Sequence, residues 1–119
     1  MGPGSRFVIV REFKVKVGCE KDFELAFGSG SVWCELLQRY SDGYLDTEVK
    51  VVSVEDRRYW VRDLWKSHWD FELFRARQQH EVEEFRKWLA MKDLVEHETL
   101  LGSFYDRAEG DEDAGLVRT

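Results

Sequence analysis

Three side chains in this sequence combine suitable chemistry with a suggestive position: Arg11, Asp63 and His80. Arg11 interrupts an apolar alternation, Asp63 lies inside an extended aromatic segment, and His80 lies where two helical patterns meet. A guanidinium can hold an oxyanion, and a carboxylate or an imidazole can accept a proton. These residues are therefore the candidate catalytic groups.

Each candidate also has a purely structural explanation. A buried guanidinium without a partner costs roughly several kcal/mol, so Arg11 is expected to pair with Asp63 across the sheet or with Glu48. Asp63 would then serve only to neutralise Arg11 or to satisfy a helix end. His80 would be a hydrogen-bonded residue at a hinge between helices. Both interpretations stay open at this point.

Four aromatic residues could form the walls of a site for a flat molecule: Trp33, Tyr40, Trp65 and Phe74. Such rings stack on planar substrates, but rings at helical or strand spacing are also ordinary core residues. The available space decides between these interpretations. If the rings fill the region between sheet and helices, an interior site is excluded, whereas an open cavity beside Arg11 or His80 favours a site.

Strands and helices must position these residues, and hydrophobic periodicity predicts where they lie. Alternation with a period of two marks strands, whereas apolar residues at i, i+3 and i+4 mark amphipathic helices. The predicted order is a strand over 6–17, a helical region broken at 28–30, strands over 44–54 and 59–66, helices from 67 to about 95, and a strand over 99–105.

Local chemistry predicts the ends and faces of some elements. Ser67 is a predicted N-cap, and Asp70 completes a pattern close to the capping box. In the second strand, Leu45 and Thr47 are expected on one face and Tyr44 on the other. The helix that follows Ser67 is therefore expected to start abruptly after an extended segment.

Length and composition are typical of a small globular protein. With 119 residues, of which 43% are hydrophobic, the chain can build one core but not two. We expect a single domain over 6–107. Residues 1–5 are interpreted as a cloning remnant, and the acidic stretch 108–119 is expected to form a flexible tail.

Charge and motifs exclude several classes of function. A formal net charge of -6 without a cluster of Lys and Arg argues against a nucleic-acid partner. No stretch approaches the roughly 20 apolar residues of a membrane span, so we expect a cytoplasmic protein without a membrane partner. The two cysteines are expected to be free thiols, and metal, nucleotide and catalytic-triad motifs are absent.

The order of elements predicts the fold class. A βαββαβ order is typical of an α+β, ferredoxin-like fold, in which helices cover one face of an antiparallel sheet. The predicted strands carry apolar groups on both faces, so the uncovered face is expected to meet a second copy. We therefore predict a homodimer.

Motifs in several elements add a family resemblance. They are Gly18 after the charged first strand, Phe27-Gly28 before Trp33, Gly43-Tyr44-Leu45 with Thr47-Glu48, and Asp63-Leu64-Trp65-Lys66-Ser67 before a Phe-rich helix. Over about 7–105 the sequence resembles the antibiotic biosynthesis monooxygenase family of the dimeric α+β barrel superfamily. The resemblance implies that two ferredoxin-like subunits pack their sheets into a barrel, each with a pocket between sheet and helices.

The haem-degrading branch of this family is disfavoured. For that branch, the resemblance implies an Asn before the strand-ending glycine, a Trp in the later helix, and a His further along that helix as the axial ligand. Arg11, Phe74 and Glu84 stand at those places here. His80 would serve as a ligand only if the helix were shifted. We therefore expect neither a metal nor another cofactor.

Two hypotheses for function remain. In the first, the resemblance implies a cofactor-independent monooxygenase, whose aromatic or polyketide-like substrate passes an electron to O2 directly once it is deprotonated. Arg11 would stabilise the phenolate, and Asp63 or His80 would move the proton. In the second, the fold serves ligand binding or dimerisation without catalysis. The fold alone does not separate the two hypotheses.

Overall fold

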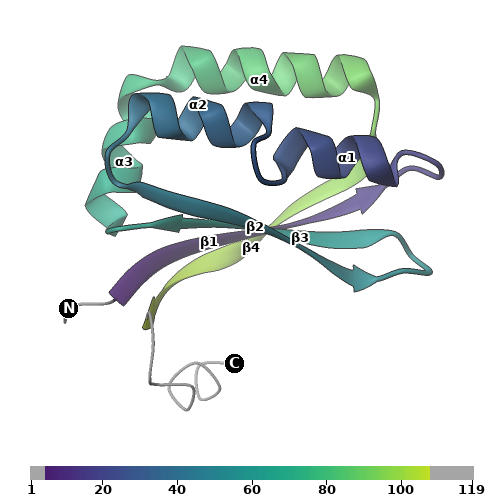
Figure 1. The fold of residues 1–119 in the computed structure, drawn as a ribbon, viewed down its shortest axis with the longest axis horizontal. Coiled ribbons are helices and arrows are strands. Elements are labelled where there is room, and N and C mark those ends of the chain that lie inside the picture. The colour runs from purple at the N-terminus through teal and green to yellow at the C-terminus, as the bar shows by residue number, and fades with distance from the viewer. Residues whose placement is uncertain (1–4, 108–119) are drawn as a thin grey trace.

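The computed structural model describes residues 5–107, which form a sheet with a layer of helices on one face (Figure 1). The elements are β1 (Ser5–Val15), α1 (Glu20–Phe27), α2 (Val32–Tyr40), β2 (Tyr44–Ser53), β3 (Arg58–Trp65), α3 (His68–Arg77), α4 (Gln79–Lys92) and β4 (Val95–Arg107). The sheet is antiparallel with the order β2-β3-β1-β4. The predicted α+β, ferredoxin-like fold is confirmed. Apart from Ser5, the predicted remnant and the predicted tail lie outside the described residues.

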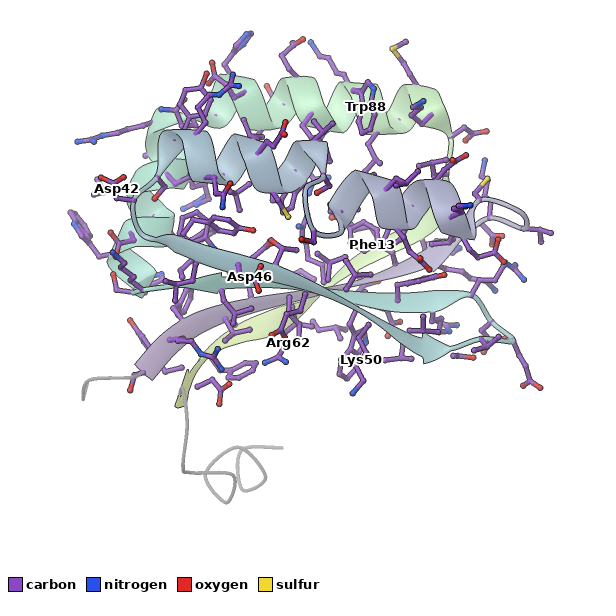
Figure 2. All side chains as sticks on the ribbon, viewed as in Figure 1. Phe13, Asp42, Asp46, Lys50, Arg62 and Trp88 are labelled. Carbon is purple, nitrogen blue, oxygen red and sulfur yellow. The ribbon has the colours of Figure 1, made fainter. Side chains whose placement is uncertain are left out.

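Alternation along the strands separates an inner face, toward the helices, from an outer face. Phe13 points toward the helices and is completely buried, whereas Arg62 and Lys50 point to the other side (Figure 2). The main core cluster therefore lies between the sheet and the helix layer, and most of its largest members are aromatic.

The register of β1 with β3 brings two predicted site residues together. Arg11 pairs with Val61, and Ile9 pairs with Asp63. Directly opposed residues in an antiparallel ladder share a face, and diagonal neighbours on that face lie within reach of a long side chain. Arg11 and Asp63 are therefore diagonal neighbours on the inner face.

Helix α3 begins where the capping pattern predicts. The Ser67 hydroxyl accepts a hydrogen bond of 3.1 Å from the Asp70 N–H and donates one of 2.7 Å to the Asp70 carboxylate. Gly43 lies against this cap, because a Cβ atom at position 43 would stand 2.3 Å from the Cβ atom of Asp70. The close approach of the two backbones therefore requires glycine at this position.

Strand β2 departs from the predicted alternation at its start. Tyr44 pairs with Trp65, but the next ladder pair along β2 is formed by Asp46, which leaves Leu45 as an extra residue in a β-bulge. Tyr44 and Thr47 consequently both face inward and are buried, while Leu45 is 40% exposed. The predicted grouping of Leu45 with Thr47 is wrong, because the bulge shifts the phase of the alternation by one residue.

The last helix and the last strand meet earlier than predicted. Helix α4 ends at Lys92, because Asp93 adopts a left-handed backbone conformation with φ 57° and ψ 46°. The Lys16 N–H then donates a hydrogen bond of 2.8 Å to the carbonyl of Leu94, and β4 starts at Val95. The predicted strand start at 99 is wrong, since pairing with β1 extends the strand toward the helix.

Candidate functional site

The structure separates the predicted catalytic residues. Arg11, Asp63 and Trp33 meet on the inner face of the sheet, beneath the helices. His80 lies with Tyr40 in an open groove on the helix layer. A mechanism that needs Arg11 and His80 on one substrate atom is not supported by this arrangement.

Asp63 is the centre of the buried polar cluster. Its carboxylate accepts hydrogen bonds from Arg11 Nη2 at 3.0 Å, from Trp33 Nε1 at 2.9 Å and from Thr47 Oγ1 at 2.7 Å. Since the Thr47 hydroxyl proton is used in this way, the Tyr44 hydroxyl donates to Thr47 Oγ1 over 2.7 Å. Asp63 is only 4% exposed, and all three of these donors come from the protein itself.

Arg11 is held by aromatic rings as well as by charge. Its guanidinium carbon lies 4.9 Å from the centroid of the Trp33 ring, 5.5 Å from that of Phe13 and 5.6 Å from that of Phe27. The Arg11 side chain is 11% exposed. Rings at such distances attract a cation, so this environment stabilises a guanidinium that the sheet has largely withdrawn from water.

A second carboxylate completes the neutralisation of Arg11. Glu98 Oε2 lies 3.6 Å from Arg11 Nη1 and 3.0 Å from Arg86 Nη2. Burial alone would raise the pKa of Glu98, but the hydrogen bonds and charges of Arg86 and Arg11 outweigh burial and lower that pKa. The other predicted partner of Arg11, Glu48, lies on the outer face and pairs with Arg62 at 3.0 Å, so that alternative is wrong.

The buried tyrosines near the sheet are poor bases at neutral pH. Burial, assisted by the hydrogen bond with Cys34, raises the pKa of Tyr44 far above its usual range. Burial and the hydrogen bond with Glu24, 3.1 Å long, raise the pKa of Tyr59 to about 12. Both hydroxyl groups therefore stay protonated and act as donors.

Aromatic side chains fill the space between sheet and helices. Trp65 is 1% exposed and packs on Phe74 with 5.3 Å between ring centroids, while Trp33 packs on Phe85 at 5.0 Å. Trp33 also covers Arg11, with 4.9 Å between the guanidinium carbon and the centroid of the indole ring. Within residues 5–107, the buried donor Trp65 Nε1 has no hydrogen-bond partner. Trp33, Trp65 and Phe74 are thus core residues in this conformation.

An open groove of about 410 Å³ lies between α2 and α4. Its residues come from these two helices, and Phe85 connects it to the core through its contact with Trp33. The groove is lined by Val32, Leu36, Arg39, Tyr40, His80, Glu81, Glu84, Phe85 and Trp88. Tyr40 is 40% exposed there, so its ring is available to a ligand.

The described residues place no group of three or more metal-ligating side chains together. Within the same residues, no helix has the length and apolar character needed to cross a membrane. Both cysteines, Cys19 and Cys34, are free thiols.

No protein-family model and no curated protein sequence matches this chain. Solved structures do match it over nearly their whole length. A protein from Nitrosomonas europaea described as a putative antibiotic biosynthesis monooxygenase superposes with a TM-score of 0.58 at 15% identity, covering 90% of this chain and 93% of that one. This chain has the antibiotic biosynthesis monooxygenase fold.

Two further structures agree with this assignment. A putative antibiotic biosynthesis monooxygenase from Bacillus cereus gives a TM-score of 0.57 at 18% identity, covering 90% of this chain and 96% of that one. The monooxygenase from the gene ActVA-Orf6 of Streptomyces coelicolor, solved in complex with the ligand nanaomycin D, gives 0.57 at 22% identity and covers 92% of each chain. The likeness of fold that the sequence motifs predict is confirmed.

Within the antibiotic biosynthesis monooxygenase fold, sequence reasoning missed several residues. Thr47 was not identified as a hydrogen-bond donor to Asp63, because only the register of β2 with β3 places these two residues opposite each other. The lining of the groove by Phe85 and Trp88 was also missed. Their spacing of three residues signals one helix face, but only the packing of α2 beside that face makes a groove.

Proposed function

We propose that this protein is a homodimer that binds a small aromatic molecule in the groove between α2 and α4. The carrying observation is the contrast between a filled interior and an open groove that presents aromatic side chains. A volume of about 410 Å³ lies within the usual range of small-molecule sites, roughly 300 to 1,000 Å³. The neighbour with nanaomycin D bound supports ligand binding as a use of this fold.

The groove offers the two kinds of contact that a small aromatic ligand requires. Val32, Leu36 and Phe85 supply apolar surface, and the rings of Tyr40 and Trp88 are placed for stacking. Trp88 lies on α4, the outermost helix of the view in Figure 2. Polar and charged side chains at the same groove would fix the orientation of the ligand.

A titration tests the binding site. We expect 1,8-dihydroxyanthrone to shift the amide resonances of residues in α2 and α4. Trp88→Ala should weaken its binding at least about fivefold, because the stacking of two aromatic rings contributes on the order of 1 kcal/mol. Trp69→Ala is the matched control, because Trp69 is 68% exposed on α3 and does not line the groove. Equal weakening by both changes would contradict the assignment.

The homodimer is supported by the outer face of the sheet, which no helix covers (Figure 1). Val8, Val10 and Leu64 form an apolar cluster there, with Trp60 packed against it. Phe104 on β4 pairs with Val8 on β1 and is 36% exposed on the same face of the sheet. Val8, Val10 and Leu64 are at most 8% exposed in the single chain, so the apolar surface open to a second copy comes from Trp60 and Phe104 beside them. Such surface suits an isologous contact between two copies.

Light scattering tests the assembly. We expect twice the mass of one chain at micromolar concentration, and a shift toward one chain mass for Phe104→Glu, because a charge would be buried in the contact. Leu25→Glu is the control, since Leu25 is 67% exposed on α1, in the helix layer. A wild-type protein that remains monomeric would refute the dimer.

The free thiols at Cys19 and Cys34 support a cytoplasmic location.

A second candidate function is oxygenation of an electron-rich phenol in the same groove. The observation that favours it is His80, which lines the groove, is exposed, and has no hydrogen bond or ion pair within the described part of the chain. His80 would take the phenol proton, and the resulting phenolate would give an electron to O2. For an anthrone, one oxygen atom of O2 then becomes the new carbonyl, and the other leaves as water with the two hydrogens of the oxidised carbon.

Oxygen uptake decides this second candidate. If His80 is the base, dihydroxyanthrone in air should be consumed with one O2 per substrate, and His80→Ala should slow the reaction roughly 100-fold. His97→Ala is a control, because His97 is exposed on β4 and does not line the groove. If oxygen uptake with the protein is no faster than in buffer without protein, the reaction is excluded and the binding proposal stands.

A further inference from the structure

We propose that the groove between α2 and α4 selects an organic cation, that is, an aromatic or aliphatic body that carries an ammonium group. This inference rests on the proposed function, because it names the charge of the ligand that the same groove would bind. Three observations carry it: the carboxylates that line the groove, the aromatic rings beside them, and a cation that one of those rings already holds.

The first observation concerns the lining charges. Two carboxylates, Glu81 and Glu84, line the groove against one cation, Arg39. Glu84 approaches Lys87 at 3.4 Å, but both side chains are more than half exposed and the pair is weak. Glu81 is partly buried and makes no ion pair within residues 5–107. An incoming ammonium group would therefore find an uncompensated carboxylate at Glu81.

The second observation is the gathering of aromatic rings at these carboxylates. Tyr40, Phe85 and Trp88 line the groove from both helices. The face of an aromatic ring carries negative potential, which attracts cations, with Trp the best of the three ring types. Rings next to a carboxylate form the chemical environment that binds quaternary ammonium groups in other proteins.

The third observation is a cation that already lies near one of these rings. The ammonium nitrogen of Lys92 lies 5.7 Å from the centroid of the Trp88 ring. Trp88 thus already attracts a cation in the free protein, and an incoming ammonium group would have to displace Lys92 from this ring or bind beside it. The formal net charge of the chain, -6, adds a long-range attraction for cations at low salt.

The positive charge of Arg39 allows a test of whether the ligand is a cation or an anion. It is exposed on α2 and has no ion pair within the described chain, so it opposes a cationic ligand and would assist an anionic one. If the ligand is cationic, removing the Arg39 charge strengthens binding. If the ligand is anionic, the same change weakens it.

The experiment compares three probes of similar size by NMR titration of the full chain: benzyltrimethylammonium, 3-phenylpropionate and the neutral alcohol 3-phenylpropan-1-ol. We expect benzyltrimethylammonium to bind most tightly, to shift the resonances of Tyr40 and Trp88, and to bind more weakly as salt is added. Tighter binding of 3-phenylpropionate would overturn the choice of charge while leaving the groove as a binding site. If no probe shifts groove residues but 1,8-dihydroxyanthrone does, this inference fails and the proposed binding site stands. If 1,8-dihydroxyanthrone does not shift them either, both fail.

Three substitutions of charged residues sharpen the test. Glu81→Gln should weaken the binding of benzyltrimethylammonium roughly threefold to fivefold, and Arg39→Gln should strengthen it roughly twofold to threefold. Glu83→Gln is the matched control, since Glu83 is exposed on α4 but does not line the groove. An equal effect of Glu81→Gln and Glu83→Gln would show only the influence of total charge and would overturn the site.

Discussion

The indole nitrogen of Trp33 donates a hydrogen bond of 2.9 Å to the carboxylate of Asp63, and this bond ties helix α2 to strand β3. The ring of the same Trp33 covers the guanidinium of Arg11, which is itself paired with Asp63 at 3.0 Å. The Trp33 side chain therefore covers the buried ion pair of Arg11 with Asp63 on the side of the helices. The arrangement describes a structural cluster, in which the charges already neutralise one another.

Loss of Asp63 is expected to destabilise the fold strongly. Asp63→Ala removes the acceptor of three hydrogen bonds and leaves the Arg11 guanidinium largely buried, with Glu98 at 3.6 Å as its remaining partner. Urea denaturation should show a loss of about 3 to 5 kcal/mol in the free energy of unfolding. Glu48→Gln, which breaks the exposed pair with Arg62, should cost less than about 1 kcal/mol. Similar costs for both would contradict a central role of Asp63.

The two members of the buried pair should be coupled. Arg11→Met alone leaves the Asp63 carboxylate with two neutral donors and no cation, so we expect a loss of about 3 kcal/mol. The double variant Arg11→Met with Asp63→Asn should cost clearly less than the sum of the single variants, by at least about 1 kcal/mol. Additive costs would show that the two residues act independently. A normally stable Arg11→Met would instead favour a functional role for Arg11.

Alkaline pH should destabilise the protein through Tyr59. Burial and Glu24 raise the folded-state pKa of Tyr59 from 10.0 to about 12, so the folded state holds its proton over a range where the unfolded state has lost it. The stabilisation is complete below pH 10.0 and is lost as the pH rises toward about 12. Urea denaturation of wild type and Tyr59→Phe between these values measures the difference. The Phe variant should show a shallower decline, and parallel curves would refute the assignment.

The junction of β3 with α3 should be sensitive to a single methyl group at Gly43. Gly43→Ala places a Cβ atom 2.3 Å from Asp70 Cβ, which the helix backbone prevents from moving freely. We expect a loss of about 1 to 3 kcal/mol from this overpacking, with part of it due to a disturbed Ser67 cap. Thermal unfolding measures the loss. Ser29→Ala, in the exposed break between α1 and α2, is the control and should change stability by less than about 0.5 kcal/mol.

The strand and helix order and the cap at Ser67 could be predicted from the sequence. These features depend on residues that lie close together in the chain, where periodicity and capping act. The pairing of Arg11 with Asp63 was among the predicted alternatives for the same reason, since both residues fall on inward positions of strands that had to be neighbours or nearly so. The family motifs extended this local information to the correct fold.

Other features were decided only by the tertiary structure. The register of β2 with β3 places Thr47 opposite Asp63, and the bulge at Leu45 brings Tyr44 to the same inner face, because strand pairing and not the local pattern decides both. How Trp33 and Phe85 pack above Arg11 depends on the placement of α2 and α4, and their ring centroids lie 5.0 Å apart. The open groove arises from the same packing. Sequence periodicity assigns residues to faces, whereas the space between two faces follows from distances that only the folded chain contains.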